Sequence, residues 1–157
     1  FVVVGPGRLT ACQPLSDDDL GFYLAGCVDA PARHRSVLPI GGPGPAITPR
    51  EQGERLFALL GRPPRFKQVP VGLMDALIGV LGVGGRLVPA LAAKAELARI
   101  GRYYATESML LWDAAAGRYD EQATPSWGRQ TLWDHYAALV RGDATTSDTQ
   151  RGDHAVF

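Results

Sequence analysis

The pattern of hydrophobic and polar positions along the chain predicts short strands that alternate with helices. Val2–Val4 and Arg8–Gln13 have the composition of strands, and a Gly5–Pro6–Gly7 turn lies between them. Glycine and proline supply the backbone angles that such a turn requires. Further short strands are predicted at Val37–Ile40, Phe66–Val69 and Met109–Trp112.

The first helix is predicted to begin after Ser16. A serine at this position accepts a hydrogen bond from the free N–H groups of the first turn, and the aspartates of Asp17–Asp19 favour the positive end of the helix dipole. Apolar residues then recur at helical spacing, so one face of this helix is expected to be apolar. These residues are Leu20, Tyr23, Leu24 and Cys27.

The clearest local signal in the chain is a capping box. Thr48 is expected to be the N-cap, Pro49 the first helical residue, and Glu51 the residue that returns a hydrogen bond to the cap. The leucines within Leu56–Leu60 are expected to form a buried stripe, and Gly61 to end the helix. Two later helices are predicted at about Val88–Gly101 and Thr131–Val140, the first of them after an apolar helical region broken near Gly82–Gly85.

Strands that alternate with helices indicate the α/β class, although the strands are too few for a complete doubly wound sheet. We therefore expect residues 1–141 to be part of a larger fold and the polar residues 142–157 to be a flexible tail. Phe1 opens inside the first predicted strand, without a leader, so residue 1 is expected to be a truncation point.

Composition excludes two classes of partner. Sixteen basic residues balance sixteen acidic ones among 157, so no net field draws the chain to nucleic acid or to an anionic membrane. The longest apolar stretch, Val69–Leu91, contains charges, prolines and glycines, and is a poor candidate for a spanning helix. An interfacial position of this stretch stays open.

Motifs with strong catalytic meaning are not evident. Gly41–Gly44 is glycine-rich, but it lacks the Lys and Ser/Thr of a phosphate-binding loop, and its proline breaks a dinucleotide fingerprint. The histidines and cysteines follow no metal-ligand spacing. No metal ligand and no catalytic residue are therefore assigned.

One polar and aromatic cluster stands out within Arg102–Met109. Tyr103, Tyr104 and Glu107 combine two phenols with a carboxylate over five positions. If they line a pocket, the rings can stack on a flat ligand while the polar groups bind its rim. The alternative, that the tyrosines are ordinary interior aromatics, is weighed equally.

Four stretches of the sequence resemble the divinyl chlorophyllide 8-vinyl reductase family, and the resemblance extends over the whole chain. The proline- and glycine-dense run within Val37–Gly53 is the most specific, and the match at the end of the chain implies that Phe157 is the natural carboxy terminus. The stretches are Arg8–Leu20, Val37–Gly53, Arg102–Met109 and Gly152–Phe157.

The resemblance implies the carboxy-terminal part of an NAD(P)-binding Rossmann-like fold of the NmrA type, an atypical short-chain dehydrogenase, together with substrate-domain helices. Such enzymes use NADPH to reduce the 8-vinyl group of divinyl chlorophyllide, or of protochlorophyllide, to ethyl during chlorophyll biosynthesis. The cofactor fingerprint would precede residue 1, so the fragment alone is expected to be inactive. The alternative is a non-catalytic NmrA-like nucleotide sensor or assembly subunit.

The resemblance also implies roles for individual residues. Gly41, Gly42 and Pro43 would let backbone approach a large flat ring, and Arg102 would pair with a substrate carboxylate beside Tyr103, Tyr104 and Glu107. Pro14 and Asp18 would lie at the rim of the cofactor crevice. Peripheral contact with a photosynthetic membrane is expected, at the chloroplast stroma or thylakoid surface in a eukaryote and in the cytoplasm of a bacterium.

Overall fold

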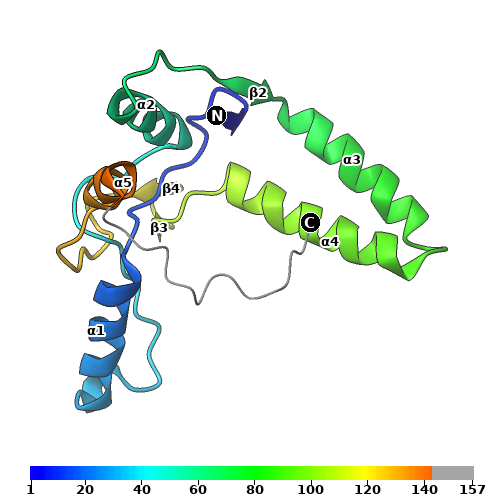
Figure 1. The fold of residues 1–157 in the computed structure, drawn as a ribbon. Coiled ribbons are helices and arrows are strands. Elements are labelled where there is room, and N and C mark those ends of the chain that lie inside the picture. Colours follow the sequence, from blue (N-terminus) through cyan, green and yellow to red (C-terminus); the bar gives the residue numbers. More distant parts are fainter. Residues whose placement is uncertain (143–157) are drawn as a thin grey trace.

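The computed structural model describes residues 1–142 and confirms a mixed α/β arrangement with small sheets (Figure 1). In chain order the elements are β1 (Val2–Val4), α1 (Asp17–Val28), the 3₁₀ helix η1 (Pro31–Arg33), α2 (Pro49–Leu59), β2 (Lys67–Val69), α3 (Val71–Gly84), α4 (Pro89–Thr106), β3 (Leu111–Asp113), β4 (Arg118–Asp120) and α5 (Leu132–Arg141). The predicted flexible tail lies outside the described residues, apart from its first residue, Gly142.

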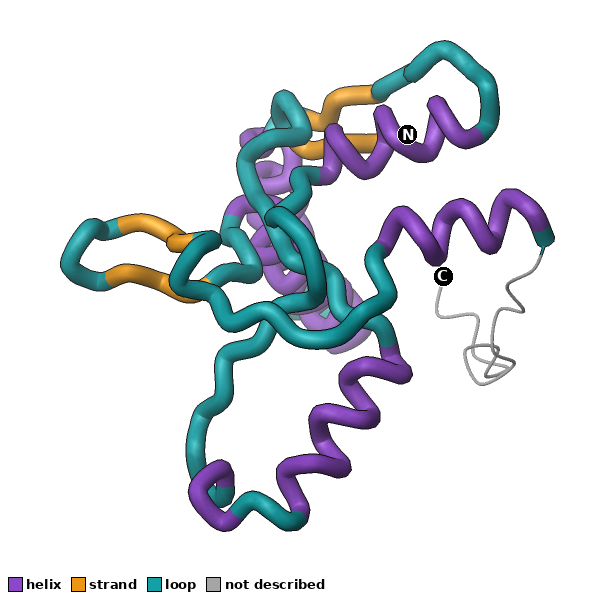
Figure 2. The backbone as a smooth tube through the Cα atoms, turned by 90° about the vertical axis from the view of Figure 1, so that its left-hand side faces the viewer, coloured by secondary structure: helices purple, strands orange, loops and turns teal. Residues whose placement is uncertain are grey.

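Two separate strand pairs make up the sheets within residues 1–142, and Figure 2 shows them as two orange pairs. β1 and β2 are parallel, with Val3 opposite Gln68. A parallel pair needs a long crossover, and here α1 and α2 lie within it. β3 and β4 form an antiparallel hairpin in which Trp112 lies opposite Tyr119, with ring centroids 5.0 Å apart.

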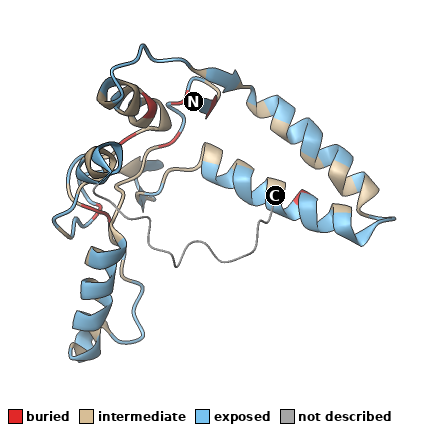
Figure 3. Ribbon diagram, in the orientation of Figure 1, coloured by how far each residue is buried: buried red, intermediate tan, exposed pale blue. Residues whose placement is uncertain are grey.

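The β1–β2 pair packs on α2 through aromatic side chains. Phe66 stands edge-on to both Phe1 and Phe57, with centroids 6.1 Å apart in each pair. Gly53 of α2 makes this approach possible, because a Cβ there would lie 2.5 Å from the Phe66 ring. Figure 3 shows that burial is confined to a few places of this kind, and in residues 1–142 the buried hydrophobic residues are Val3, Ile47 and Ala95.

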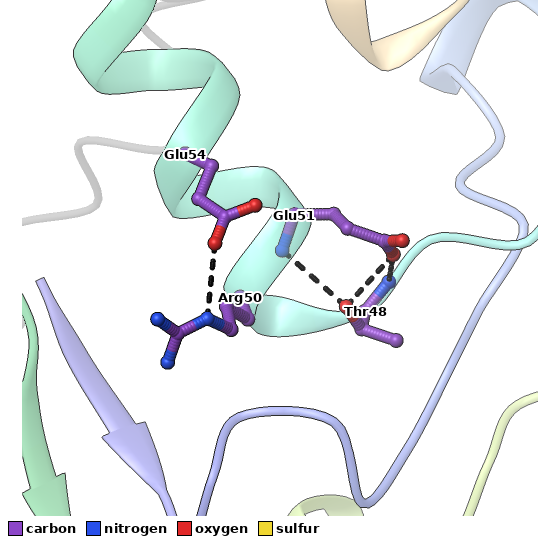
Figure 4. A network of polar contacts seen from close by, with 4 residues as sticks. All are labelled: Thr48, Arg50, Glu51 and Glu54. Carbon is purple, nitrogen blue, oxygen red and sulfur yellow. Dashed lines mark hydrogen bonds and ion pairs between the residues drawn. The ribbon is translucent and has the colours of Figure 1, made fainter. Parts of the chain in front are cut away.

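The predicted capping box at the start of α2 is confirmed (Figure 4). The Glu51 N–H donates to Thr48 Oγ1 at 3.3 Å, and the Thr48 N–H donates to Glu51 Oε2 at 2.7 Å. The bond from the Thr48 N–H, and after it a bond from the Thr48 hydroxyl to the same carboxylate oxygen, lower the pKa of Glu51. Arg50 pairs with Glu54 at 2.9 Å and lies over the Phe66 ring, so the same turn is tied to the aromatic cluster.

The two long helices α3 and α4 form a hairpin that projects from the rest of the chain (Figure 1). The predicted break between them is confirmed, since α3 ends at Gly84 and α4 begins at Pro89. Close packing at the turn requires glycine, because a Cβ on Gly85 would lie 2.8 Å from Ala92 Cα. Ala95 is the buried residue of α4.

Two strand predictions are wrong. Arg8–Gln13 is not a strand; within it only Cys12 makes isolated bridges, to Ile47 and Met109. β1 pairs instead with β2, more than sixty residues further on. Val37–Ile40 forms no strand either, and Val37 is 96% exposed. Apolar composition does not make a strand where no partner strand is available.

The helix predictions agree better with the structure than the strand predictions do. Ser16 Oγ accepts from the Asp19 N–H at 3.1 Å, which confirms the start of α1. Gly61 closes α2 with a positive φ of 62°, as expected, although Leu60 is exposed rather than part of a buried stripe. α4 runs to Thr106, five residues beyond its predicted end at Gly101, so most of the Arg102–Met109 cluster is helical.

Candidate functional site

Residues Thr10–Pro14, which we call the central segment, connect the regions in which site residues were predicted. On one side, Ala11 pairs with the end of α4: its N–H donates to Ser108 Oγ at 3.0 Å and its carbonyl accepts from the Met109 N–H at 2.9 Å. On the other, Cys12 exchanges backbone bonds of 3.1 and 2.8 Å with Ile47. The central segment therefore brings the Arg102–Met109 cluster close to the Gly41–Pro43 loop.

At the end of α4, Arg102 is held by an acidic residue of α3. Its Nε donates to Asp75 Oδ1, and this bond raises the pKa of Arg102. Nε is only one of the nitrogens of the guanidinium, which carries five N–H donors in a fixed fork. The terminal nitrogens stay available for a second carboxylate, so the predicted role of Arg102 is compatible with its pairing to Asp75.

Glu107, the C-cap of α4, faces the β3–β4 hairpin. Its Oε2 accepts a 2.6 Å hydrogen bond from the Tyr119 hydroxyl. This bond is the main reason why the pKa of Tyr119 rises to about 12. Tyr119 stays protonated at neutral pH, and Glu107 is committed to orienting it. The pair therefore places a phenol, which the sequence reasoning had missed, beside the predicted cluster.

The two tyrosines of α4 are exposed and differ in surroundings. Their rings meet edge-on, with centroids 5.8 Å apart. Tyr104 lines a cavity of about 200 Å³, together with β1, the Gly7–Thr10 turn and Pro49. Ligand pockets are typically about 300–1,000 Å³. The cavity is therefore suited to part of a ligand, with the exposed Tyr104 ring at its edge and the Tyr103 ring next to that of Tyr104.

Gly41 and Gly42 lie at a tightly packed junction beside the central segment. The Gly42 N–H donates to Gln13 O at 2.8 Å, and the Gly41 N–H donates to Pro125 O at 2.7 Å. A Cβ on Gly42 would lie 1.6 Å from the carbonyl oxygen of Pro14. Glycine is needed here because two backbone segments approach each other closely. Pro43 follows directly, at the start of the exposed turn.

The two residues predicted to contact a cofactor, Pro14 and Asp18, flank the start of α1. Pro14 packs on Gly42, and Asp18 is exposed. Their neighbour Asp19 accepts 3.0 Å bonds from the N–H groups of Arg129 and Gln130. These bonds, from Arg129 first, lower the pKa of Asp19. The helix start is thus a negatively charged corner that is anchored to the loop before α5.

The thiol of Cys12 and the ring of His34 have surroundings that favour a structural role. Burial raises the pKa of the Cys12 thiol, which disfavours the thiolate needed for nucleophilic chemistry. The His34 ring contacts the carbonyls of Cys27 and Val28 at the end of α1. Within residues 1–142, no group of three or more His, Cys, Asp or Glu side chains is arranged to hold a metal ion.

Sequence reasoning identified the Arg102–Glu107 cluster but not its partners. Asp75 lies 27 positions before Arg102, and Tyr119 lies 12 positions after Glu107. Neither contact follows a helical or strand period, so no periodic signal could have found it. Asp19 was noted only as part of the acidic first turn, whereas its main contacts are more than a hundred positions away.

The chain is similar to part of three enzymes named divinyl chlorophyllide a 8-vinyl-reductase, chloroplastic. It is 49% identical to the Arabidopsis thaliana protein over 141 residues, which are 90% of this chain and 34% of that protein. The Zea mays protein is 49% identical over 90% of this chain and 35% of its own length. The Cucumis sativus protein is 45% identical over 100% of this chain and 37% of its own length. The chain thus spans about a third of the length of these relatives. No protein-family model and no solved structure matches it.

Proposed function

We propose that this chain, which is homologous to about a third of the divinyl chlorophyllide a 8-vinyl-reductases, forms the part of such an enzyme that shapes the substrate pocket. The whole enzyme reduces the 8-vinyl group of divinyl chlorophyllide, or of divinyl protochlorophyllide, to ethyl. Hydride from NADPH adds to one vinyl carbon and a proton to the other, and NADP⁺ is released. The observation that carries the proposal is the identity of 45–49% over 90–100% of the chain.

The end of α4 is the part of the chain whose chemistry matches such a substrate. Chlorophyllide combines a flat apolar ring system with a carboxylate. The exposed rings of Tyr103 and Tyr104 offer stacking surfaces, and the free nitrogens of Arg102 suit a carboxylate. Glu107 fixes the Tyr119 hydroxyl nearby. We assign substrate contact to this cluster and leave the proton donor unassigned.

The cavity beside Tyr104 is too small for the whole pigment, so the pocket needs further walls. At about 200 Å³ it has room for one edge of a macrocycle. We propose that the remaining walls come from parts of the enzyme outside this chain. Gly41, Gly42 and Pro43 would then contribute by holding the central segment and the loop at the pocket edge in place, and a direct contact of Pro43 with the ring is part of the proposal.

The start of α1, beside the predicted cofactor-contact residues Pro14 and Asp18, does not fit the pyrophosphate of NADPH. A dinucleotide site presents a glycine-rich turn and a helix start free of negative charge. Here α1 begins with Asp17, Asp18 and Asp19, which repel phosphate. The proposed NADPH site therefore belongs mainly to the rest of the enzyme. The resemblance to NmrA-type reductases implies that this site lies in a Rossmann domain. Pro14 and Asp18 are proposed to border it, where a carboxylate can accept a bond from a ribose hydroxyl.

A chimera tests the proposal with this chain in place. The homologous third of the Arabidopsis thaliana enzyme is replaced by residues 1–157, and the chimera is assayed with NADPH and divinyl chlorophyllide by the shift of the pigment absorption bands. Conversion to the monovinyl product is the expected result. A folded chimera that binds NADPH but does not convert the pigment would contradict the proposal and favour the nucleotide-sensor alternative.

Arg102 offers the sharpest variant within the chimera. Arg102→Lys removes the forked geometry but keeps the charge, and we expect KM for the pigment to rise about tenfold with little change in kcat, a loss of about 1.4 kcal/mol in binding. Arg99→Lys is the matched control, because Arg99 lies on the same helix and its ion-pair partner among residues 1–142 is Glu96, at 2.7 Å. Equal effects of both variants would exclude a specific role for Arg102.

A further inference from the structure

Helix α3 carries apolar side chains on two neighbouring faces, and only one of them is covered within residues 1–142. Met74, Ile78 and Leu81 share the half-buried face toward α4. The other face carries apolar side chains at helical spacing that are exposed, namely Leu73, Leu77, Val80 and Val83, and Leu87 continues it into the turn. A helix that is apolar all round is found in a protein core or in a lipid environment.

The exposed face is most pronounced toward the tip of the hairpin. Val80 is 71% exposed, Val83 66% and Leu87 87%. Figure 3 shows the outer side of the hairpin as exposed over much of its length. At the tip, the glycines at 84 and 85 let the turn pack closely on Leu91 and Ala92. An exposed apolar surface on a closely packed turn indicates a docking surface.

The charges of the tip are all positive. The twenty residues from Ala76 to Ala95 contain Arg86 and Lys94 and no acidic residue. Both side chains are exposed, and neither has an ion-pair partner within the part of the chain described here. The acidic residues of the hairpin, Asp75 and Glu96, lie outside this stretch and pair with arginines. The tip therefore combines exposed aliphatic side chains with two free cations.

Helix α1 also exposes apolar side chains, but its charge is the opposite. Leu20, Phe22 and Leu24 of α1 are exposed, but this helix begins with three aspartates and ends at Asp29. An anionic surface would repel it. The coincidence of apolar and cationic groups thus distinguishes the hairpin tip from α1.

We propose that the tip of the α3–α4 hairpin docks on an anionic lipid surface. Val80, Val83 and Leu87 enter the boundary between headgroups and acyl chains, while Arg86 and Lys94 contact the lipid phosphates. No helix among residues 1–142 is long and apolar enough to cross a bilayer, so the docking is shallow. The inference deepens the proposed function by specifying a membrane contact, but it rests on the hairpin alone and needs neither NADPH nor pigment.

Vesicle binding tests the proposal directly. The 157-residue chain is sedimented with vesicles of phosphatidylcholine alone and with vesicles containing 30% phosphatidylglycerol, at about 50 and 500 mM salt. We expect binding that is stronger to the anionic vesicles and weaker at high salt, because exposed charges are screened. The double variant Val83→Glu/Leu87→Glu is expected to lose binding at least tenfold, and Arg86→Glu/Lys94→Glu to lose the preference for anionic lipid.

Phe22→Glu is the matched control, because it places the same charge at an exposed apolar position of α1 and should change binding less than twofold. A Leu87→Trp variant gives an independent signal: its additional emission should shift to shorter wavelength and be quenched by brominated lipid. Unchanged binding by Val83→Glu/Leu87→Glu, an equal loss in Phe22→Glu, or absence of quenching would each overturn the proposal. The proposal would also be overturned if the chain self-associated and Val83→Glu/Leu87→Glu abolished self-association rather than vesicle binding, since the face would then bind a second copy.

Discussion

The Gly41–Gly42 junction offers a sharp test of whether the packing of the central segment holds this chain together. In Gly42→Ala the new Cβ would lie 1.6 Å from Pro14 O and 2.4 Å from Pro14 C. Since Cβ contacts under 3.0 Å essentially never occur, the two backbones must separate by about 1.4 Å. Neither atom belongs to a flexible side chain, so no rotamer change can relieve the overlap.

The cost can be estimated from the bonds that hold Gly41 and Gly42 in place, which a displacement of the Gly42 backbone by this amount breaks. Gly42 N–H to Gln13 O is 2.8 Å, Gly41 N–H to Pro125 O is 2.7 Å, and Ser126 Oγ to Gly42 O is 3.0 Å. A typical hydrogen bond contributes about 0.5–1.5 kcal/mol net, so loss of all three lowers the free energy of unfolding by roughly 2–4 kcal/mol. That is a large fraction of the ~5–15 kcal/mol of an ordinary domain.

Urea titration followed by tryptophan fluorescence measures this effect. Trp127 is a local reporter, because its backbone N–H donates to Gly41 O at 2.9 Å and the centroid of its ring lies 5.4 Å from that of the Tyr23 ring. The control is Gly21→Ala on α1, where an added Cβ meets nothing within 4 Å and should stabilise the helix by about 0.5–1 kcal/mol. A free energy of unfolding for Gly42→Ala within about 0.5 kcal/mol of that of the unaltered chain would refute the reasoning.

Two further predictions concern groups with perturbed titration. Thr48→Ala should lower the free energy of unfolding by about 1 kcal/mol at pH 7, measured by the same urea titration. Because the pKa of Glu51 is lowered by its bonds to Thr48, the capping contribution is complete above the ordinary value of 4.5 and is lost as the pH falls through the lower value in the folded chain. Tyr119 should titrate near pH 12 by ultraviolet absorbance, and Glu107→Gln should bring its pKa back toward 10; an unchanged titration would show that Glu107 does not hold the phenol.

Local signals in the sequence predicted the helix boundaries well, because the interactions that set them are local. The Thr48–Glu51 box and the Ser16 cap each join residues three positions apart. Gly61 ends α2 through its own backbone conformation. Only the far end of α4 was misplaced, because Gly101 is tolerated inside the helix, where an added Cβ would meet nothing within 4 Å.

Strand pairing could not be predicted in the same way, because it depends on distant partners. Val37–Ile40 has the composition of a strand but no neighbour with which to exchange hydrogen bonds. β4 was missed because Arg118 and Asp120 flank its single aromatic residue, and only the pairing with β3 makes it a strand. The same limit applies to the site, where Asp75 and Tyr119 reach the predicted cluster across loops and helices.

Helix α4 joins the two surfaces for which we propose a function, and its rigidity keeps them apart. Tyr104 borders the cavity near one end, whereas Leu91 packs under the hairpin turn near the other. Thirteen residues at 1.5 Å per residue separate them by about 20 Å. A substitution at Leu87 should therefore change lipid binding without moving a pocket residue. Docking and substrate binding are thus separable by mutation, so either proposal can fail while the other stands.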